Sequence, residues 1–169
     1  FVSSNFISIK KEGYTLDNKD LSLADSDNLN YSFYNNSYIS VVVETENDDH
    51  IMFLSEKTFK PIMCYHPFIL LGSKHSLKTL KSLGYKTFSN WWDESYDNFD
   101  NIYDRIYYAF KEIKKICQLD KNSLSVMIKD MESVLEYNAN HYMTNKHSLN
   151  SFYFINKTIK IENKLNSII

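Results

Sequence analysis

Glycine and proline are scarce in this chain: its 169 residues include only three glycines and two prolines. The phosphate-binding loops of dinucleotide-binding and Walker-type enzymes need closely spaced glycines, because the backbone must approach the phosphates. Neither the GxGxxG pattern nor a Walker loop occurs in the sequence. The composition therefore disfavours a generic nucleotide-binding enzyme of those two classes.

Cysteine and long hydrophobic runs are also lacking. Cys64 and Cys117 lie in apolar, helical sequence contexts without the paired spacing of a zinc site, so we expect buried, reduced thiols and no disulfide. The apolar runs are too short to cross a bilayer, and no signal-peptide pattern opens the chain. We expect a cytoplasmic protein with no membrane span.

Neither sign of charge dominates the sequence. The Lys and Arg residues number 19 and the Asp and Glu residues 21, which gives a formal net charge of -2. Because nucleic-acid-binding domains usually carry a strong basic field, this balance argues against nucleic acid as a partner. The length suits one domain that buries its own core, so we expect residues 1–169 to form a single domain.

Apolar runs alternate with helical patterns through the middle of the chain. Ser55 is a good helix N-cap, Pro61 is discordant within the helix that follows, and Gly84 is placed to end a second helix. The predicted order is strand 39–44, helix 56–65, strand 67–71, helix 76–83 and strand 85–88, the first two strands being buried on both faces. Short loops in such an order require a parallel sheet.

Less regular or purely helical segments flank this middle part. Residues 1–38 are poorly defined, with a short helix predicted over 30–38, and helical periodicity returns over 99–117, 123–138 and 144–164. We expect residues 99–169 to form helices that cover the sheet. The predicted fold class is therefore α/β, a Rossmann-like parallel sheet half-domain with additional C-terminal helices.

The predicted helix start at Ser55 places a hydroxyl, a carboxylate and an ammonium group at a helix N-terminus. Glu56 and Lys57 follow the cap directly, where unpaired N–H groups already favour anions. Since ligands of parallel sheets bind at the carboxyl ends of the strands, a nucleotide diphosphate fits this position. The alternative is ordinary capping with a solvated lysine, and the residues alone do not separate the two.

Several segments together resemble the C-terminal nucleotide-sugar-binding half of fucosyltransferase-like glycosyltransferases, the family 10-like, two-domain B-type. They are VVVET, LSEKTFKPI, HPFILLG, LKTLKSLGYKTF and WWDESYD, between about Tyr38 and Arg105. The resemblance implies that Glu56 binds the nucleotide's ribose and that Lys57 binds the diphosphate and is the catalytic residue. Glu44 and Thr45 fall on the strand-end motif and Ser55 on the helix cap. Thr45 stands where the family usually has Asn.

The resemblance implies a donor-binding domain for a nucleotide-diphosphate sugar. The sugar would be transferred to a glycan or another hydroxyl acceptor without a metal or a separate cofactor, and the general base would come from an N-terminal acceptor domain or a partner chain. Lys60, with Lys74 and Lys78, would add a positive rim around the diphosphate or simply form a solvated face. The alternative function is a non-catalytic binding or assembly module on a degenerate glycosyltransferase fold.

The acidic and aromatic segment WWDESYD, residues 91–97, has two interpretations. Its rings and carboxylates could face a sugar, or they could cap the next helix and fill the core, and we favour the structural role. Arg105, on the helix that follows, is predicted to form an ion pair with Asp97 or Asp104.

No metal site is expected. The acidic stretch 48–50 lacks the strand-end context of a metal motif, so a solvated loop is favoured. Cys64, His66 and His75 have a spacing that matches no closed site. Packing or loop roles are favoured for these three residues, with His66 lining the cleft.

Overall fold

The computed structural model describes residues 31–45 and 52–145 of the chain. The predicted features of residues 1–30, the acidic stretch 48–50 and nearly all of the predicted helix 144–164 lie outside these ranges. The described elements are α2 (Tyr31–Asn35), β1 (Ser40–Val43), α3 (Glu56–Met63), β2 (Phe68–Leu71), α4 (Ser76–Ser82), the short 3-10 helix η2 (Ser95–Asn98), α5 (Ile102–Cys117) and α6 (Lys121–Asp130). Residues 132–145 are also helical, after a turn at Met131.

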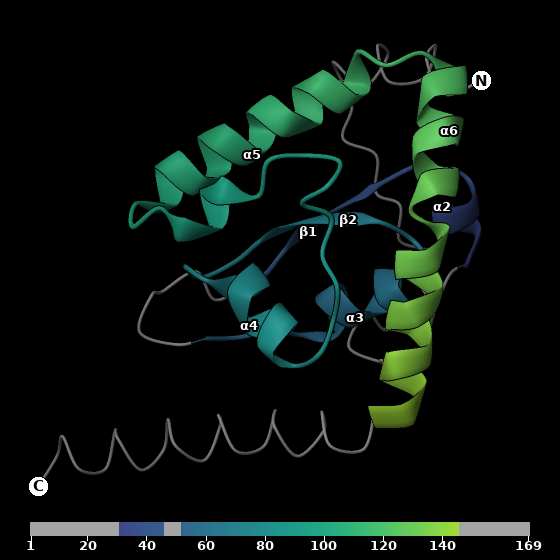
Figure 1. The fold of residues 1–169 in the computed structure, drawn as a ribbon. Helices are drawn as coiled ribbons and strands as arrows, with labels where there is room; N and C mark the ends of the chain where they lie inside the picture. The colour runs from purple at the N-terminus through teal and green to yellow at the C-terminus, as the bar shows by residue number, and fades with distance from the viewer. Residues whose placement is uncertain (1–30, 46–51, 146–169) are drawn as a thin grey trace, which may run out of the picture.

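The fold is mixed α/β, with a small parallel sheet at its centre (Figure 1). β1 and β2 pair in parallel, with Ser40 opposite Phe68 and Val43 opposite Leu71, and they are the two strands found within the described residues. A parallel pair needs a crossover connection, and α3 lies in the chain between the two strands. The predicted strand, helix, strand and helix order up to residue 82 is thus confirmed.

Helices lie on both sides of the two strands. In Figure 1, α5 lies above the strands, and α3 and α4 lie below them. All four residues of β2 are buried, as predicted. In β1 the prediction of burial on both faces is wrong: Val42 is buried, whereas Val41 is 47% and Val43 52% exposed. These two side chains share one face because side chains alternate along a strand, and that face of β1 is open in the described part of the molecule.

Residues 85–88, predicted as a third strand, form no strand. The backbone there is satisfied by side chains: Lys86 N–H donates to Asn138 at 2.8 Å, the Asn138 amide donates to the Lys86 carbonyl at 2.8 Å, and Phe88 N–H donates to Glu94 at 2.8 Å. Because these side chains meet the backbone's hydrogen-bonding needs, the segment needs no neighbouring strand.

The C-terminal helical part adds three buried residues to the core, Ala109, Met131 and Leu135. α5 packs its buried face, which includes Ala109, on β2 and η2, and Met131 and Leu135 belong to the same apolar cluster. Both cysteines are free, as predicted, but Cys64 is only half-buried and Cys117 is exposed, so the prediction of two buried thiols is wrong. Within residues 31–45 and 52–145, no helix has both the length and the apolar composition needed to cross a bilayer.

Candidate functional site

The predicted helix start lies at the carboxyl end of β1. Ser55 has extended backbone and caps α3: its hydroxyl accepts a hydrogen bond from Lys57 N–H at 3.1 Å. The cap predicted from sequence is confirmed, and so is its position in the connection from strand to helix. This local geometry follows from the preference of a serine hydroxyl for an otherwise unpaired N–H in the first turn.

Glu44 ties this cap to the strand. It is the residue after β1 and is 1% exposed, and its carboxylate accepts hydrogen bonds from Ser55 N–H at 2.9 Å and from the Ser55 hydroxyl at 2.6 Å. A third bond comes from the hydroxyl of Thr58, one turn into α3. A negative charge at a helix N-terminus is favourable. Glu44 therefore fixes where α3 begins relative to the end of β1.

Lys57 turns back over this junction. Its ammonium group donates to the hydroxyl of Thr45, while most of its side chain remains exposed. Glu56 is half-buried in the same turn, and Lys60 lies three residues further along α3, nearly one helical turn away. Hydrogen bonds thus link Glu44 to Ser55, Ser55 to Lys57 and Lys57 to Thr45. Within the described residues, no hydrogen bond joins the Lys60 side chain to this series of contacts.

The end of β2 lies against the same carboxylate. Gly72 follows β2, and a Cβ atom on it would be 2.6 Å from the hydroxyl oxygen of Ser76 and 3.6 Å from Cγ of Glu44. A larger residue would therefore push into the start of α4. The close approach of Gly72 allows the two strand ends and the two helix starts to meet at one edge of the sheet.

The first turn of α4 is already occupied by a carboxylate. Asp97 accepts hydrogen bonds from Leu77 N–H at 3.0 Å and Lys78 N–H at 3.1 Å, and its own carbonyl accepts from His75 N–H at 2.8 Å. Burial raises the pKa of Asp97, and the two N–H groups of α4 oppose that shift. Sequence analysis missed this role, because Asp97 caps a helix that lies about 20 residues earlier in the chain.

The rest of segment 91–97 has the structural role that sequence analysis favoured. Glu94 is buried and accepts from the Thr87 hydroxyl at 2.6 Å and from Phe88 N–H at 2.8 Å, and Lys81 is its ion-pair partner at 3.3 Å. Trp92 is 4% exposed within the core. Asp93 accepts from Ser95 N–H at 2.8 Å, and this hydrogen bond lowers the pKa of its carboxyl. No acid of this segment caps the next helix, α5, whose N-cap is Asn101.

Arg105 and His66 both form hydrogen bonds that the sequence pattern did not predict. Arg105 is 2% exposed and donates to the carbonyls of Phe99 at 2.7 Å and Asp100 at 3.0 Å. His66 lies just before β2, at the amino end of the strands, where Ser40 Oγ is 3.0 Å from Nδ1 and Ser37 Oγ is 3.2 Å from Nε2. Its packing role is confirmed, but its predicted place in a cleft at the carboxyl end is wrong.

No group of three or more His, Cys, Asp or Glu side chains among the described residues is arranged to hold a metal ion. Cys64 and His66 lie at the end of α3 and before β2, whereas His75 lies at the start of α4. Cys64 and His66 thus precede β2 in the chain, at its amino end, and His75 follows it, at its carboxyl end. The three side chains considered as ligands are therefore distributed over opposite edges of the sheet.

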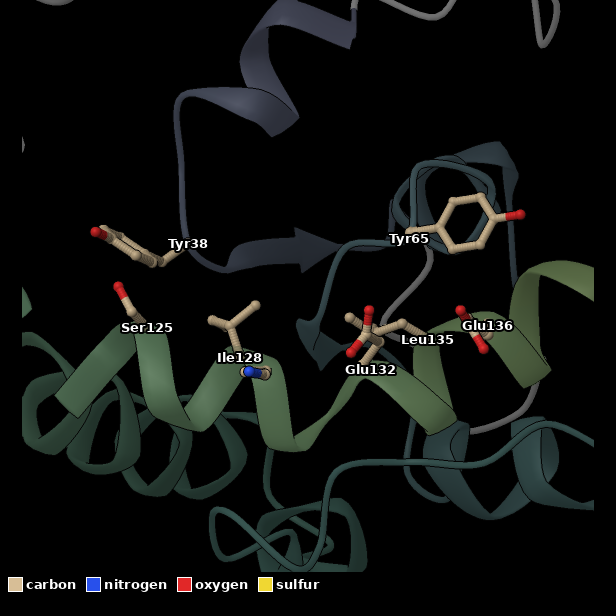
Figure 2. Close-up of a pocket in the computed structure, with 8 residues that line it drawn as sticks. Tyr38, Tyr65, Ser125, Ile128, Glu132, Leu135 and Glu136 are labelled. Atoms are coloured by element: carbon tan, nitrogen blue, oxygen red, sulfur yellow. The ribbon is translucent and has the colours of Figure 1, made fainter. Parts of the chain in front are cut away.

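A groove of about 560 Å³ lies at the amino edge of the sheet (Figure 2). Tyr38, before β1, and Tyr65, after α3, face the helical residues 125–136 across it, and Glu132 and Glu136 border it on the helix side. None of the six candidate residues, Glu44, Thr45, Ser55, Glu56, Lys57 and Lys60, lines this groove. The polar junction and the groove are thus at opposite ends of the strands.

Comparisons with family models, with curated proteins and with solved structures find no match to this chain.

Proposed function

We propose that the chain binds a nucleotide-diphosphate sugar at the junction of β1 and α3, as the donor-binding domain of a metal-independent glycosyltransferase on a Rossmann-like fold. The observation that carries the proposal is the position of Lys57. Its ammonium lies at the carboxyl end of a parallel strand and in the first turn of a helix, which is where parallel sheets bind phosphates.

In this proposal the residues divide into two groups. Glu44 and Ser55 are positioning residues, since their hydrogen bonds are made within the protein and set the start of α3. Lys57 exchanges its bond to Thr45 for the diphosphate and neutralises the charge that develops when the sugar–phosphate bond breaks. Glu56, next to it, accepts hydrogen bonds from the ribose hydroxyls. The hydroxyl acceptor and its general base come from a second domain or a partner chain.

A non-catalytic binding or assembly module is the second candidate. One observation favours it: the polar groups of the junction already have partners within the protein. The Glu44 carboxylate accepts three hydrogen bonds, and the Lys57 ammonium is bonded to Thr45. Such a junction is complete as a structural connection, and a ligand would have to displace the bond between Lys57 and Thr45.

Thermal unfolding with nucleoside diphosphates and nucleotide sugars distinguishes the two candidates. A ligand at a hundredfold excess over its Kd stabilises the folded protein by about 2.7 kcal/mol, which is a rise of several degrees in the midpoint. The donor-binding proposal expects such a rise with at least one nucleoside diphosphate. No rise with any nucleotide tested would favour the assembly module.

Lys57→Glu tests the site itself. The substitution is on an exposed side chain, so the protein should fold, and the thermal shift with the nucleoside diphosphate should disappear. Lys121→Glu, on exposed α6, carries the same charge change away from the junction and should keep the shift. A shift that persists in Lys57→Glu places the nucleotide elsewhere and overturns the assignment of Lys57.

A further inference from the structure

The outward face of α5 carries large aromatic side chains. Tyr103 is 77%, Tyr107 60% and Phe110 58% exposed, and their spacing of four and three residues puts them on one stripe of the helix. Full burial of an aromatic side chain removes 150–250 Å², so these three leave about 400 Å² exposed. A patch of that size is within the range of the largest apolar patch on a soluble monomer, and such patches are often functional. We call Tyr103, Tyr107 and Phe110 the aromatic stripe.

Opposite charges lie along one flank of the stripe. Asp104 and Lys111 are both exposed and are seven residues apart, which is close to two helical turns. They therefore share a flank, with the acid toward the N-terminus of α5 and the base toward its C-terminus. Lys111 also lies near the aromatic rings, with Nζ 5.7 Å from the ring centre of Tyr107 and 5.1 Å from that of Tyr108.

The charges on this flank are complementary to those of a second copy related by a two-fold axis. In two antiparallel helices related by a two-fold axis across their contact, a flank of one helix meets the same flank of the other in reverse order. With the axis beside Tyr107, Asp104 of each copy lies opposite Lys111 of its partner. The same axis brings the two aromatic stripes together, and the antiparallel helix dipoles add a favourable term.

We propose that the aromatic stripe of α5 is a contact between two copies of this chain, packed antiparallel with reciprocal pairs of Asp104 and Lys111. This surface is independent of the proposed donor site. An anionic bilayer would attract Lys111 but repel Asp104, so the mixed charge favours a second copy over a membrane. Stable dimers bury about 800 Å² per partner, and the stripe alone is smaller, so the dimer should be weak and concentration-dependent.

Sedimentation equilibrium of the full chain with charge-reversed variants tests the pairing. Asp104→Lys and Lys111→Asp should each weaken dimerisation at least tenfold, because each places like charges opposite one another. An equimolar mixture of these two variants should dimerise again, since every pair between them is of opposite sign. The double variant with both substitutions should also dimerise by itself. Glu132→Lys, an acid-to-lysine change on a different surface, should behave as the wild type.

Three results would overturn the proposal. The first is a wild-type chain that stays monomeric to several hundred micromolar, and the second is a dimer that is unaffected by both single reversals. The third is a monomer that sediments with phosphatidylserine vesicles and loses this binding in Lys111→Asp, which would make the stripe a membrane contact. Circular dichroism should give the same helix content for all variants, as expected for exposed positions.

Discussion

The carboxylate of Glu44 binds Ser55 twice, through the backbone N–H at 2.9 Å and through the hydroxyl at 2.6 Å. The two residues are eleven positions apart in the chain, and both are buried. One side chain therefore determines how the first helix of the strand–helix–strand unit starts relative to the first strand. Every assignment of a ligand to this edge of the sheet depends on that bond pair.

Glu44→Gln should lower the free energy of unfolding by about 2 kcal/mol. A glutamine amide has one acceptor oxygen and one donor group, so it cannot accept all three hydrogen bonds that Ser55 and Thr58 donate to the Glu44 carboxylate, and the hydroxyl facing its NH₂ would have to give up its role as a donor. Urea denaturation measures the change. Glu132→Gln, at an exposed position, should change stability by less than about 0.5 kcal/mol. Equal effects of the two substitutions would refute the anchoring role of Glu44.

Tyr65→Gly should be about 1 kcal/mol more stable than Tyr65→Ala. Tyr65 has a φ of 52° at the end of α3, in a Schellman motif where His66 N–H donates to the Pro61 carbonyl at 2.9 Å and Tyr65 N–H to the Ile62 carbonyl at 3.2 Å. Both variants lose the ring, but only glycine avoids the left-handed strain. Comparing the thermal denaturation midpoints of Tyr65→Gly and Tyr65→Ala measures that strain. Equal midpoints would show that the left-handed backbone at residue 65 costs no stability.

Gly84→Ala should destabilise the protein by about 2 kcal/mol or more, since it combines left-handed strain with a clash. Gly84 has a φ of 91°, and a Cβ atom there would lie 2.7 Å from the His141 ring. His141→Ala alone loses the contact of Nε2 with the Leu83 carbonyl at 2.8 Å. In a double-mutant cycle by urea denaturation, Gly84→Ala should cost less in the His141→Ala background, because only the clash is relieved. Strict additivity would show that the ring moves aside freely.

His66 should make the folded state sensitive to acid. Burial lowers the pKa of His66 in the folded protein below its ordinary value of 6.5, against the hydrogen bonds to backbone that oppose the shift. The unfolded state then binds more protons between the folded pKa and 6.5, so stability rises with pH in that window and is lost as pH falls through it. His66→Gln should remove this part of the dependence. Denaturant midpoints from pH 4 to 8 measure it, and parallel curves for the two proteins would contradict the effect.

Local patterns predicted the elements around the candidate site well. Two strands and two helices are predicted between Ile39 and Leu83, and their observed ends differ from the predicted ones by at most two residues. The predicted cap at Ser55 is also correct. These features depend on neighbours within one turn or one strand. Capping, apolar periodicity and the glycine after a helix act over such distances.

The predictions that were wrong concern segments whose hydrogen-bond partners lie far away in the sequence. Residues 85–88 have the composition of a strand, but Asn138 and Glu94 satisfy their backbone. Asp97 caps a helix that precedes it rather than the one that follows. A distant side chain can take the hydrogen-bonding place of a neighbouring strand, or can cap a helix, without any signal in the local sequence.

The amino-acid sequence by itself determined the order of strand and helix, the capped start of α3 and the placement of Glu56 and Lys57 in its first turn, because each arises from contacts among near neighbours. Only the tertiary structure decided that Glu44 anchors this start, that one face of β1 stays open, and that an aromatic stripe on α5 faces outward. These outcomes depend on which surfaces are left after distant segments have packed, and a one-dimensional pattern does not contain that information.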